Sequence, residues 1–317
     1  PLEPHFEGEK IILVPDGRLS YLPFDALLTE KPSGPAMNYS GLPYLIHEYQ
    51  ISYAYHSIFT RGRQLPPVRF PELSAWAPSY DAPGQNGWGP LEGAEDEVRA
   101  IVRMTGGKAL RGELNREEVL ALLQARGIIH LATHAVAPDN PGSSPYFVLN
   151  PGPGGGEPER IHDFEIQSMA APSSLVVLSG CETAGGYEQK GEGVLNLSRS
   201  FLQAGARSVV HSLWPVVDPN ASKIVVDFYR GLKLGNSRTA SLRRAKINYL
   251  EEASPSYTHP HYWATLQVTG DPGPVRMKWW NWLAGLMALS AFILALIRIY
   301  FLLKRRRSFR SASASSL

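Results

Sequence analysis

Cysteine is almost absent from this sequence, because Cys181 is the only one among 317 residues. A single thiol excludes a disulfide bond within the chain, and it also excludes zinc sites that are built on several thiolates. The remaining composition, with 44% hydrophobic and 19% charged residues, is ordinary for a globular protein. The sequence therefore predicts a globular fold without disulfide bonds or a thiolate zinc site.

Positive and negative side chains are also nearly balanced over most of the chain. The formal net charge is +2, and the last fourteen residues alone hold five basic side chains. Without this tail the chain is slightly acidic, so no surface for nucleic acid is expected. A phosphate-binding loop is missing as well, because Gly152–Gly156 is followed by neither a lysine nor a helix start.

Two apolar runs organise the middle of the sequence. IIHLATHA spans Ile128–Ala135 and holds a histidine near its end, whereas SLVVLSGCET spans Ser174–Thr183 and holds the cysteine. Continuous apolar runs bounded by Gly, Pro and Ser are typical of buried parallel strands. The carboxyl ends of such strands meet at the edge of the sheet where α/β proteins place their ligand sites. We therefore expect His134 and Cys181 to lie on the same edge.

These two residues have the chemistry of a nucleophilic pair. A thiol attacks as a thiolate, and an imidazole beside it accepts the thiol proton and later donates it to the leaving amine. His134 precedes Cys181 by 47 positions, close to the roughly 50 of caspase-type pairs. His130 competes as the base, but it lies inside the predicted strand and we interpret it as a core histidine. The alternative for Cys181 is a small, inert core residue.

Strand and helix patterns alternate around these two runs. Further strands are predicted at Leu73–Ala77, Lys108–Leu110, Ser208–Leu213 and Tyr262–Thr269, and helices at Ala94–Met104, Asn115–Gln124, Leu195–Ala204, Ala221–Leu234 and Thr239–Glu251. Such alternation is typical of a parallel sheet that is covered by helices on both faces. Near the N-terminus, Lys10–Val14 and Leu19–Leu22 flank the turn Pro15–Gly17, which predicts a hairpin.

Several strings in the sequence resemble one known family. IHLATHA, VVLSGCETAGG with KGEGV after it, and FLQAGARSVVHSLWPVVD are similar to segments of the CHAT family, whose caspase-like domains are related to separase. The resemblance runs from about Lys10 to Pro272. It implies an α/β fold, namely a caspase-like three-layer α/β/α sandwich with a mainly parallel sheet. Some members of this family act in bacterial defence, so a bacterial source is expected.

The resemblance also implies an activity and roles for individual residues. It identifies the chain as a cysteine endopeptidase with Cys181 as nucleophile and His134 as proton acceptor. The oxyanion is expected to bind the backbone N–H groups of Ala135 and Cys181. Ala135 replaces the glycine that more commonly follows the histidine, and its Cβ restricts the backbone angles there. This mechanism needs no metal ion and no cofactor.

Two acidic residues are predicted to bind substrate. Asp218 follows the LWPV segment, and the acid at that place in separase-like enzymes binds a basic side chain before the cleaved bond. Glu182, directly after the nucleophile, is the second. The alternative for Asp218 is a helix cap, because it precedes Pro219 at a predicted helix start.

Two other functions are consistent with the same residues. The first is a non-catalytic signalling or scaffolding module that uses the cleft to bind a protein partner. The second is an acyl transferase that uses the same pair of residues. Protein or peptide substrates are the expected partners, and the resemblance implies tetratricopeptide-type repeats upstream, since the chain starts at Pro1 rather than Met and is expected to be part of a longer protein.

The sequence divides into a predicted catalytic domain and a predicted membrane anchor. The expected divisions are a CHAT domain at 1–272, with an N-terminal hairpin and scaffold segment at 1–70 and a core at 71–272, a linker at 273–278, a transmembrane helix at 279–303 and a basic, serine-rich tail at 304–317. Residues Trp279–Ile297 contain no charged side chain, and the 25 residues of 279–303 would span roughly 37 Å as a helix.

The flanking charges predict how this helix would be oriented. Two basic residues precede it and five follow it, and basic residues are enriched on the cytoplasmic side of membrane helices. The sequence therefore predicts a single-pass membrane protein with a cytoplasmic C-terminal tail and an extracytoplasmic catalytic domain.

Overall fold

The structure of the chain is a computed structural model. It describes residues 8–32, 39–56, 72–78, 91, 93–110, 112, 114–136, 143–149, 159–179, 187–189, 193–195, 197–214, 219–275 and 286–299. The chain divides into two compact units, Pro1–Met277 and Lys278–Leu317.

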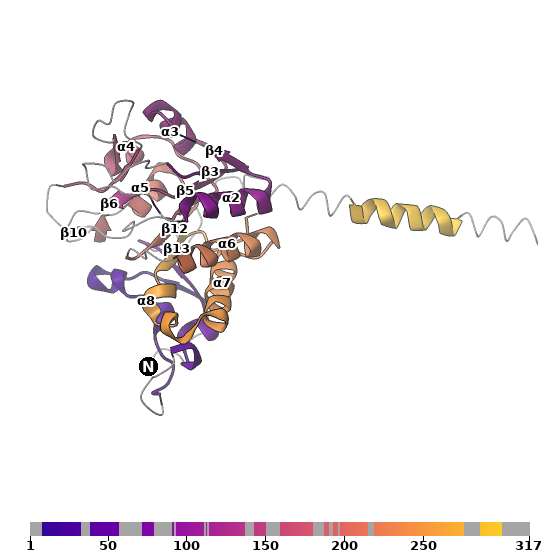
Figure 1. Ribbon diagram of the computed structural model, residues 1–317, viewed down its shortest axis with the longest axis horizontal. Helices are drawn as coiled ribbons and strands as arrows, with labels where there is room; N and C mark the ends of the chain where they lie inside the picture. The colour runs from indigo at the N-terminus through magenta and orange to yellow at the C-terminus, as the bar shows by residue number, and fades with distance from the viewer. Residues whose placement is uncertain are drawn as a thin grey trace, which may run out of the picture. The chain divides into compact units, whose positions relative to one another are not determined.

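The described part of the first unit is organised around an eight-stranded sheet (Figure 1). In spatial order the strands are β1 (Lys10–Leu13), β2 (Gln50–Tyr53), β13 (Leu266–Gly270), β12 (Ser208–Ser212), β9 (Leu175–Leu178), β5 (Ile128–Leu131), β3 (Leu73–Trp76) and β4 (Lys108–Leu110). All neighbours pair in parallel except β12 and β13, which are antiparallel. The predicted α/β fold with a mainly parallel sheet is confirmed.

The central strands are those with the most continuous apolar sequence. Every residue of β5 (IIHL), β9 (LVVL) and β12 (SVVHS) is buried. Strands covered on both faces have no solvent-facing positions, so their sequences do not alternate between apolar and polar residues. In the edge strand β1, whose sequence is KIIL, the exposure alternates instead, with Ile12 exposed and Ile11 half-buried.

Helices cover both faces of the sheet and form the predicted three layers. On one face, α3 (Arg116–Leu123), α4 (Asp163–Ser168) and α5 (Leu197–Ala204) contribute to a core that includes Ile129 and Val176. On the other face lie α2 (Ala94–Thr105), α6 (Pro219–Lys233) and α7 (Arg238–Glu252), with α6 packed between the other two (Figure 1). His130, next to Ile129 in β5, points to this second face, where its ring contacts Tyr229 of α6.

Local capping explains where the best-predicted helices begin and end. The Asn115 side chain accepts a hydrogen bond from the Glu118 N–H at 2.9 Å, and the Glu118 carboxylate accepts one from the Asn115 N–H at 3.0 Å, so that the two residues form a capping box at the start of α3. Gly106 ends α2 with φ 73°, a conformation that favours glycine.

Shorter strands extend from the loops at the carboxyl ends of the central strands. β6 (Ala135–Val136), β7 (Tyr146–Val148) and β8 (Arg160–His162) form an antiparallel three-stranded sheet. β10 (Tyr187–Gln189) pairs with β11 (Gly193–Leu195) in a separate antiparallel hairpin. β6 follows the predicted base His134 directly, and β10 begins six positions after the predicted nucleophile Cys181.

The hairpin that the sequence predicts near the N-terminus is wrong. β1 pairs in parallel with β2, from Lys10 beside Gln50 to Leu13 beside Tyr53. The second predicted strand lies instead in a 3₁₀ helix, η2 (Gly17–Tyr21), whose first N–H donates to the Asp16 side chain at 2.9 Å. The turn residues therefore cap a helical turn and do not reverse the strand.

The N-terminal segment is bound to the rest of the unit by buried polar contacts. Lys246 of α7 donates a hydrogen bond to the Asp25 carboxylate, and Arg243 Nε donates to the Ile46 carbonyl at 2.6 Å. Since β1 and β2 also belong to the main sheet, this segment is an integral part of the sandwich.

In the second unit, residues 286–299 form a helix. These 14 residues extend roughly 21 Å at about 1.5 Å per residue, whereas a bilayer interior is about 30 Å thick. Among the residues that the structure describes, no helix has both the length and the apolar character needed to cross a membrane. The predicted transmembrane helix at 279–303, and the single-pass topology built on it, are therefore wrong.

Candidate functional site

The predicted base His134 lies just beyond the carboxyl end of β5 and is half-buried. Its carbonyl accepts a hydrogen bond from the Val148 N–H at 2.8 Å, and the Thr133 hydroxyl donates to the Val148 carbonyl at 2.7 Å. The backbone on both sides of the imidazole is thus held by β7. These two hydrogen bonds fix the backbone from which the His134 side chain projects.

Ala135, one of the two predicted oxyanion donors, is the first residue of β6 and is 5% exposed. It lies opposite Phe147 in the antiparallel pairing of β6 with β7. Ala135 adopts an extended strand conformation there, so the glycine that is more usual at this place is not required by the backbone.

The strand that leads to the predicted nucleophile is the direct neighbour of β5. Leu131 pairs with Leu178 in the parallel register of β5 and β9, and the Ser179 N–H donates to the Leu131 carbonyl at 2.8 Å. Cys181, Glu182 and Asp218 lie outside the described residues. What the described residues establish is that the chain leaves β5 and β9 at one edge of the sheet.

Trp214 stands at the same edge, two residues beyond the end of β12. The sequence alone did not single out this residue, although a large aromatic residue directly after a buried strand is a usable signal. Its N–H donates to the Thr265 hydroxyl at 3.3 Å, and that hydroxyl donates to the Trp214 carbonyl at 2.9 Å. The indole Nε1 donates to the His261 carbonyl at 2.9 Å.

His130 is a buried core histidine, as predicted, with 0% of its surface exposed. Its Nε2 lies 3.1 Å from a carboxylate oxygen of Glu97, and its Nδ1 lies 3.3 Å from the Tyr229 hydroxyl. Burial, followed by the Glu97 charge, raises the pKa of Tyr229 well above its usual value. The Tyr229 hydroxyl therefore stays protonated beside His130. Through its contacts with Glu97 and Tyr229, His130 of β5 links α2 to α6.

His211 of β12 is also buried, and its Nε2 lies 2.9 Å from the Thr269 hydroxyl. Burial lowers the pKa of His211 to about 4, although a hydrogen bond to the backbone of Ser212 opposes this shift. The ring is therefore neutral at physiological pH. It is a structural residue of the sheet core.

The sequence that forms this site and the sheet matches a protein-family model. The CHAT domain model matches residues 1–271. The chain belongs to the CHAT domain family. The match covers the main sheet and every described helix of the first unit.

Two curated relatives of this CHAT domain are mammalian. Tetratricopeptide repeat protein 28 of Homo sapiens is 28% identical over 58% of the chain, and the protein of the same name from Mus musculus is 26% identical over 82%. The chain spans only 8% and 12% of these proteins, respectively. Both names support a tetratricopeptide-repeat context among relatives, whereas the expected bacterial source gains no support.

Solved structures with a similar arrangement include two protein classes. In the separase–securin complex of Saccharomyces cerevisiae, the similarity covers 74% of this chain and 15% of that chain, with 16% identity and a TM-score of 0.48. For gingipain R, an Arg-specific cysteine proteinase, it covers 64% and 47%, with 8% identity and a TM-score of 0.44. Similarity at this level says nothing about the activity of the chain.

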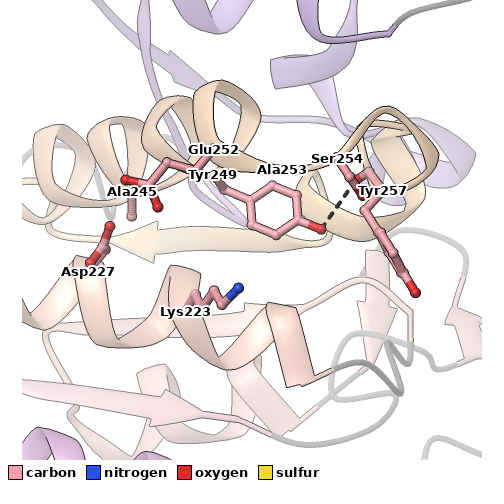
Figure 2. A pocket seen from close by; sticks show the side chains of 8 residues that line it. All are labelled: Lys223, Asp227, Ala245, Tyr249, Glu252, Ala253, Ser254 and Tyr257. Atoms are coloured by element: carbon pink, nitrogen blue, oxygen red, sulfur yellow. Dashed lines mark hydrogen bonds between the residues drawn. The ribbon is translucent and has the colours of Figure 1, made fainter.

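A pocket of about 210 Å³ lies elsewhere on the CHAT domain, between α6 and α7 (Figure 2). Its lining is of mixed charge and comprises Lys223, Asp227, Ala245, Tyr249, Glu252, Ala253, Ser254 and Tyr257. The Tyr249 hydroxyl donates to the Tyr257 carbonyl at 3.2 Å across one end of it. His134 and Ala135, the predicted catalytic and oxyanion residues that the structure describes, do not line this pocket.

Within the described ranges, no three His, Cys, Asp or Glu side chains converge on a possible metal position. The expectation of a chain without metal or cofactor stays a prediction.

Proposed function

We propose that this CHAT domain is a cysteine endopeptidase in which Cys181 is the nucleophile and His134 the proton acceptor. The observation that carries the proposal is the register of β5 and β9, which places Leu131 beside Leu178. His134 follows Leu131, and Cys181 follows Leu178, by three positions each. In a parallel sheet, two residues that follow a pair of aligned residues by the same number of positions are expected at the same edge of the sheet.

The mechanism follows from the chemistry of this pair. His134 takes the thiol proton, and the Cys181 sulfur adds to the scissile carbonyl carbon. The carbonyl oxygen becomes an oxyanion, which accepts hydrogen bonds from the backbone N–H groups of Ala135 and Cys181. The C–N bond then breaks as His134 protonates the leaving amine. Water, deprotonated by His134, hydrolyses the thioester and restores the thiol.

The proposed preference is for a basic residue before the cleaved bond. Asp218 would pair with its positive charge, and Glu182 would contact the substrate next to the nucleophile. Asp218 directly precedes α6, which starts at Pro219, so the capping alternative stands beside this role. Replacing Asp218 by Ala and by Asn distinguishes the two, because both variants weaken charge pairing whereas Asn retains capping.

A thiol-reactive peptide with a basic residue at its reactive end tests the proposal. Because Cys181 is the sole cysteine, covalent labelling detected by intact mass reports on this residue alone. We expect saturable labelling of the wild type and cleavage of a matching peptide, and neither reaction in Cys181→Ala. Labelling of the native chain no faster than that of the urea-unfolded chain would contradict the proposal.

The relatives favour a second candidate function. Their shared name refers to tetratricopeptide repeats and not to hydrolysis, and the chain spans 8% to 12% of their length. A non-catalytic module that binds a protein partner at the same edge of the sheet is consistent with this context. A partner bound equally well by the wild type and Cys181→Ala, without cleavage, would favour this role.

A further inference from the structure

Trp214 occupies a defined place relative to the two strands that carry the proposed catalytic pair. Val209 pairs with Val176 and Val210 with Val177 in the parallel register of β12 and β9. The next row of the sheet therefore aligns His211 with Leu178, and Leu178 pairs with Leu131.

Trp214 lies three positions beyond His211, as His134 lies three positions beyond Leu131. Both residues therefore lie beyond the same row of the sheet, at the same edge. The strand β9 lies between β12 and β5, which lead to them. Neighbouring strands are about 4.8 Å apart. A peptide chain bound across this edge would therefore pass within side-chain reach of Trp214.

The backbone and ring of Trp214 are held in place before any ligand arrives. Thr265 is 3% exposed, and its hydroxyl bonds both the N–H and the carbonyl of Trp214. The indole N–H is anchored on the His261 carbonyl in α8 (Pro260–Trp263). An aromatic ring that is fixed in advance binds with little loss of conformational entropy.

Trp214 remains half-buried, and a flat, polar ring lies beside its indole. The imidazole of His261 is exposed and lies nearly parallel to the indole, with 11° between the planes and 6.0 Å between the centroids. A guanidinium group stacks on an indole face in the same parallel geometry. The position of the imidazole shows that a flat, polar ring fits beside the indole.

We propose that Trp214 determines specificity by packing its indole face against a basic substrate side chain next to the cleaved bond, with arginine favoured over lysine. This inference rests on the proposed peptidase function and adds Trp214 to the residues that contact the substrate. Arginine is favoured because its guanidinium is planar and weakly hydrated, whereas the lysine ammonium is compact and strongly hydrated.

Binding to the Cys181→Ala chain tests this role without catalysis. Three peptides differ only at the residue before the scissile bond, which is arginine, lysine or citrulline, the neutral isostere of arginine. We expect arginine to bind about tenfold more tightly than citrulline, a difference that matches one cation–π contact in a partly desolvated place. Adding Trp214→Leu should abolish this difference, whereas Trp214→Phe should retain part of it.

His261→Ala is the matched control, because it removes the stacked ring but leaves the indole and the His261 carbonyl. We expect it to keep the preference for arginine, with thermal unfolding showing that every variant is folded. The proposal is overturned if arginine and citrulline bind equally, if no peptide binds at about 1 mM, or if Trp214→Leu and His261→Ala weaken arginine binding alike.

The two proposals fail separately. Labelling of Cys181 is measured on the wild-type chain and reports only on the nucleophile. A chain that discriminates arginine from citrulline through Trp214 but is never labelled would contradict the peptidase function and retain the recognition site.

Discussion

Lys246 of α7 and Asp25 of the N-terminal segment form a hydrogen-bonded ion pair inside the first unit, although 221 positions separate them in the chain. The Lys246 side chain is 0% exposed and that of Asp25 is 9% exposed. This pair binds the segment between β1 and β2 to the helix layer that covers the sheet.

Removing one member of this pair should destabilise the fold strongly. Lys246→Met leaves a buried carboxylate without its cation, and we expect a loss of about 3–5 kcal/mol in the free energy of unfolding. The double variant Asp25→Leu with Lys246→Met should recover much of this loss, because no charge then stays buried. Urea unfolding of the wild type, of Lys246→Met and Asp25→Leu alone, and of the double variant measures these changes, and strictly additive effects would contradict the pairing.

The buried His211 should make stability depend on pH. Burial lowers the folded-state pKa of this histidine from 6.5 to about 4. The unfolded chain therefore binds the proton first as the pH falls, so this contribution is full above about pH 6.5 and is lost toward pH 4, by an amount on the order of 3 kcal/mol. His211→Asn should flatten the slope of unfolding free energy between these pH values. An unchanged slope would refute the assignment.

The two histidines of the β5 segment should have separable roles. We expect His134→Ala to slow the labelling of Cys181 by a factor of roughly 100 or more, because the thiol loses its base, with little change in stability. His130→Asn should instead lower the melting temperature through its buried contacts with Glu97 and Tyr229, while the folded fraction is still labelled. The exposed His47 provides a control, and His47→Ala should alter neither quantity. Equal labelling defects in the His130 and His134 variants would remove the distinction.

Gly270 and Gly106 should respond differently to alanine, although both have positive φ, at 100° and 73°. A Cβ on Gly270 would lie 2.5 Å from the Arg207 carbonyl oxygen, whereas a Cβ on Gly106 meets no atom within 4 Å. We expect Gly106→Ala to cost about 1 kcal/mol, from backbone strain alone. Gly270→Ala should cost about 3 kcal/mol or more, because β12 and β13 must also separate. Chemical unfolding of the two variants side by side tests this order.

Much of the sheet could be predicted because its central strands have a characteristic local sequence. The runs in β5 and β9 are continuous and apolar, and every residue of both strands is buried. α2 and α3 were predicted from the spacing of their apolar residues, and the capping residues at their ends act within one turn. The location of His134 at the end of β5 followed from the same local pattern.

Strand partners could not be predicted in the same way. β1 pairs with β2, about forty residues away, and not with the nearer segment that becomes η2. The last predicted strand starts only at Leu266, because Pro260 opens the short helix α8 that carries His261. The contact of His261 with Trp214 depends on the pairing of β12 with β13, so no local pattern indicates it.

The sequence by itself determined which segments become buried strands and which residues carry reactive groups, because hydrophobic periodicity and capping act over a few neighbouring residues. Only the tertiary structure decided which strands are neighbours and that Leu131, Leu178 and His211 share one row. These features depend on contacts between segments far apart in the chain, whose free energies no local pattern contains.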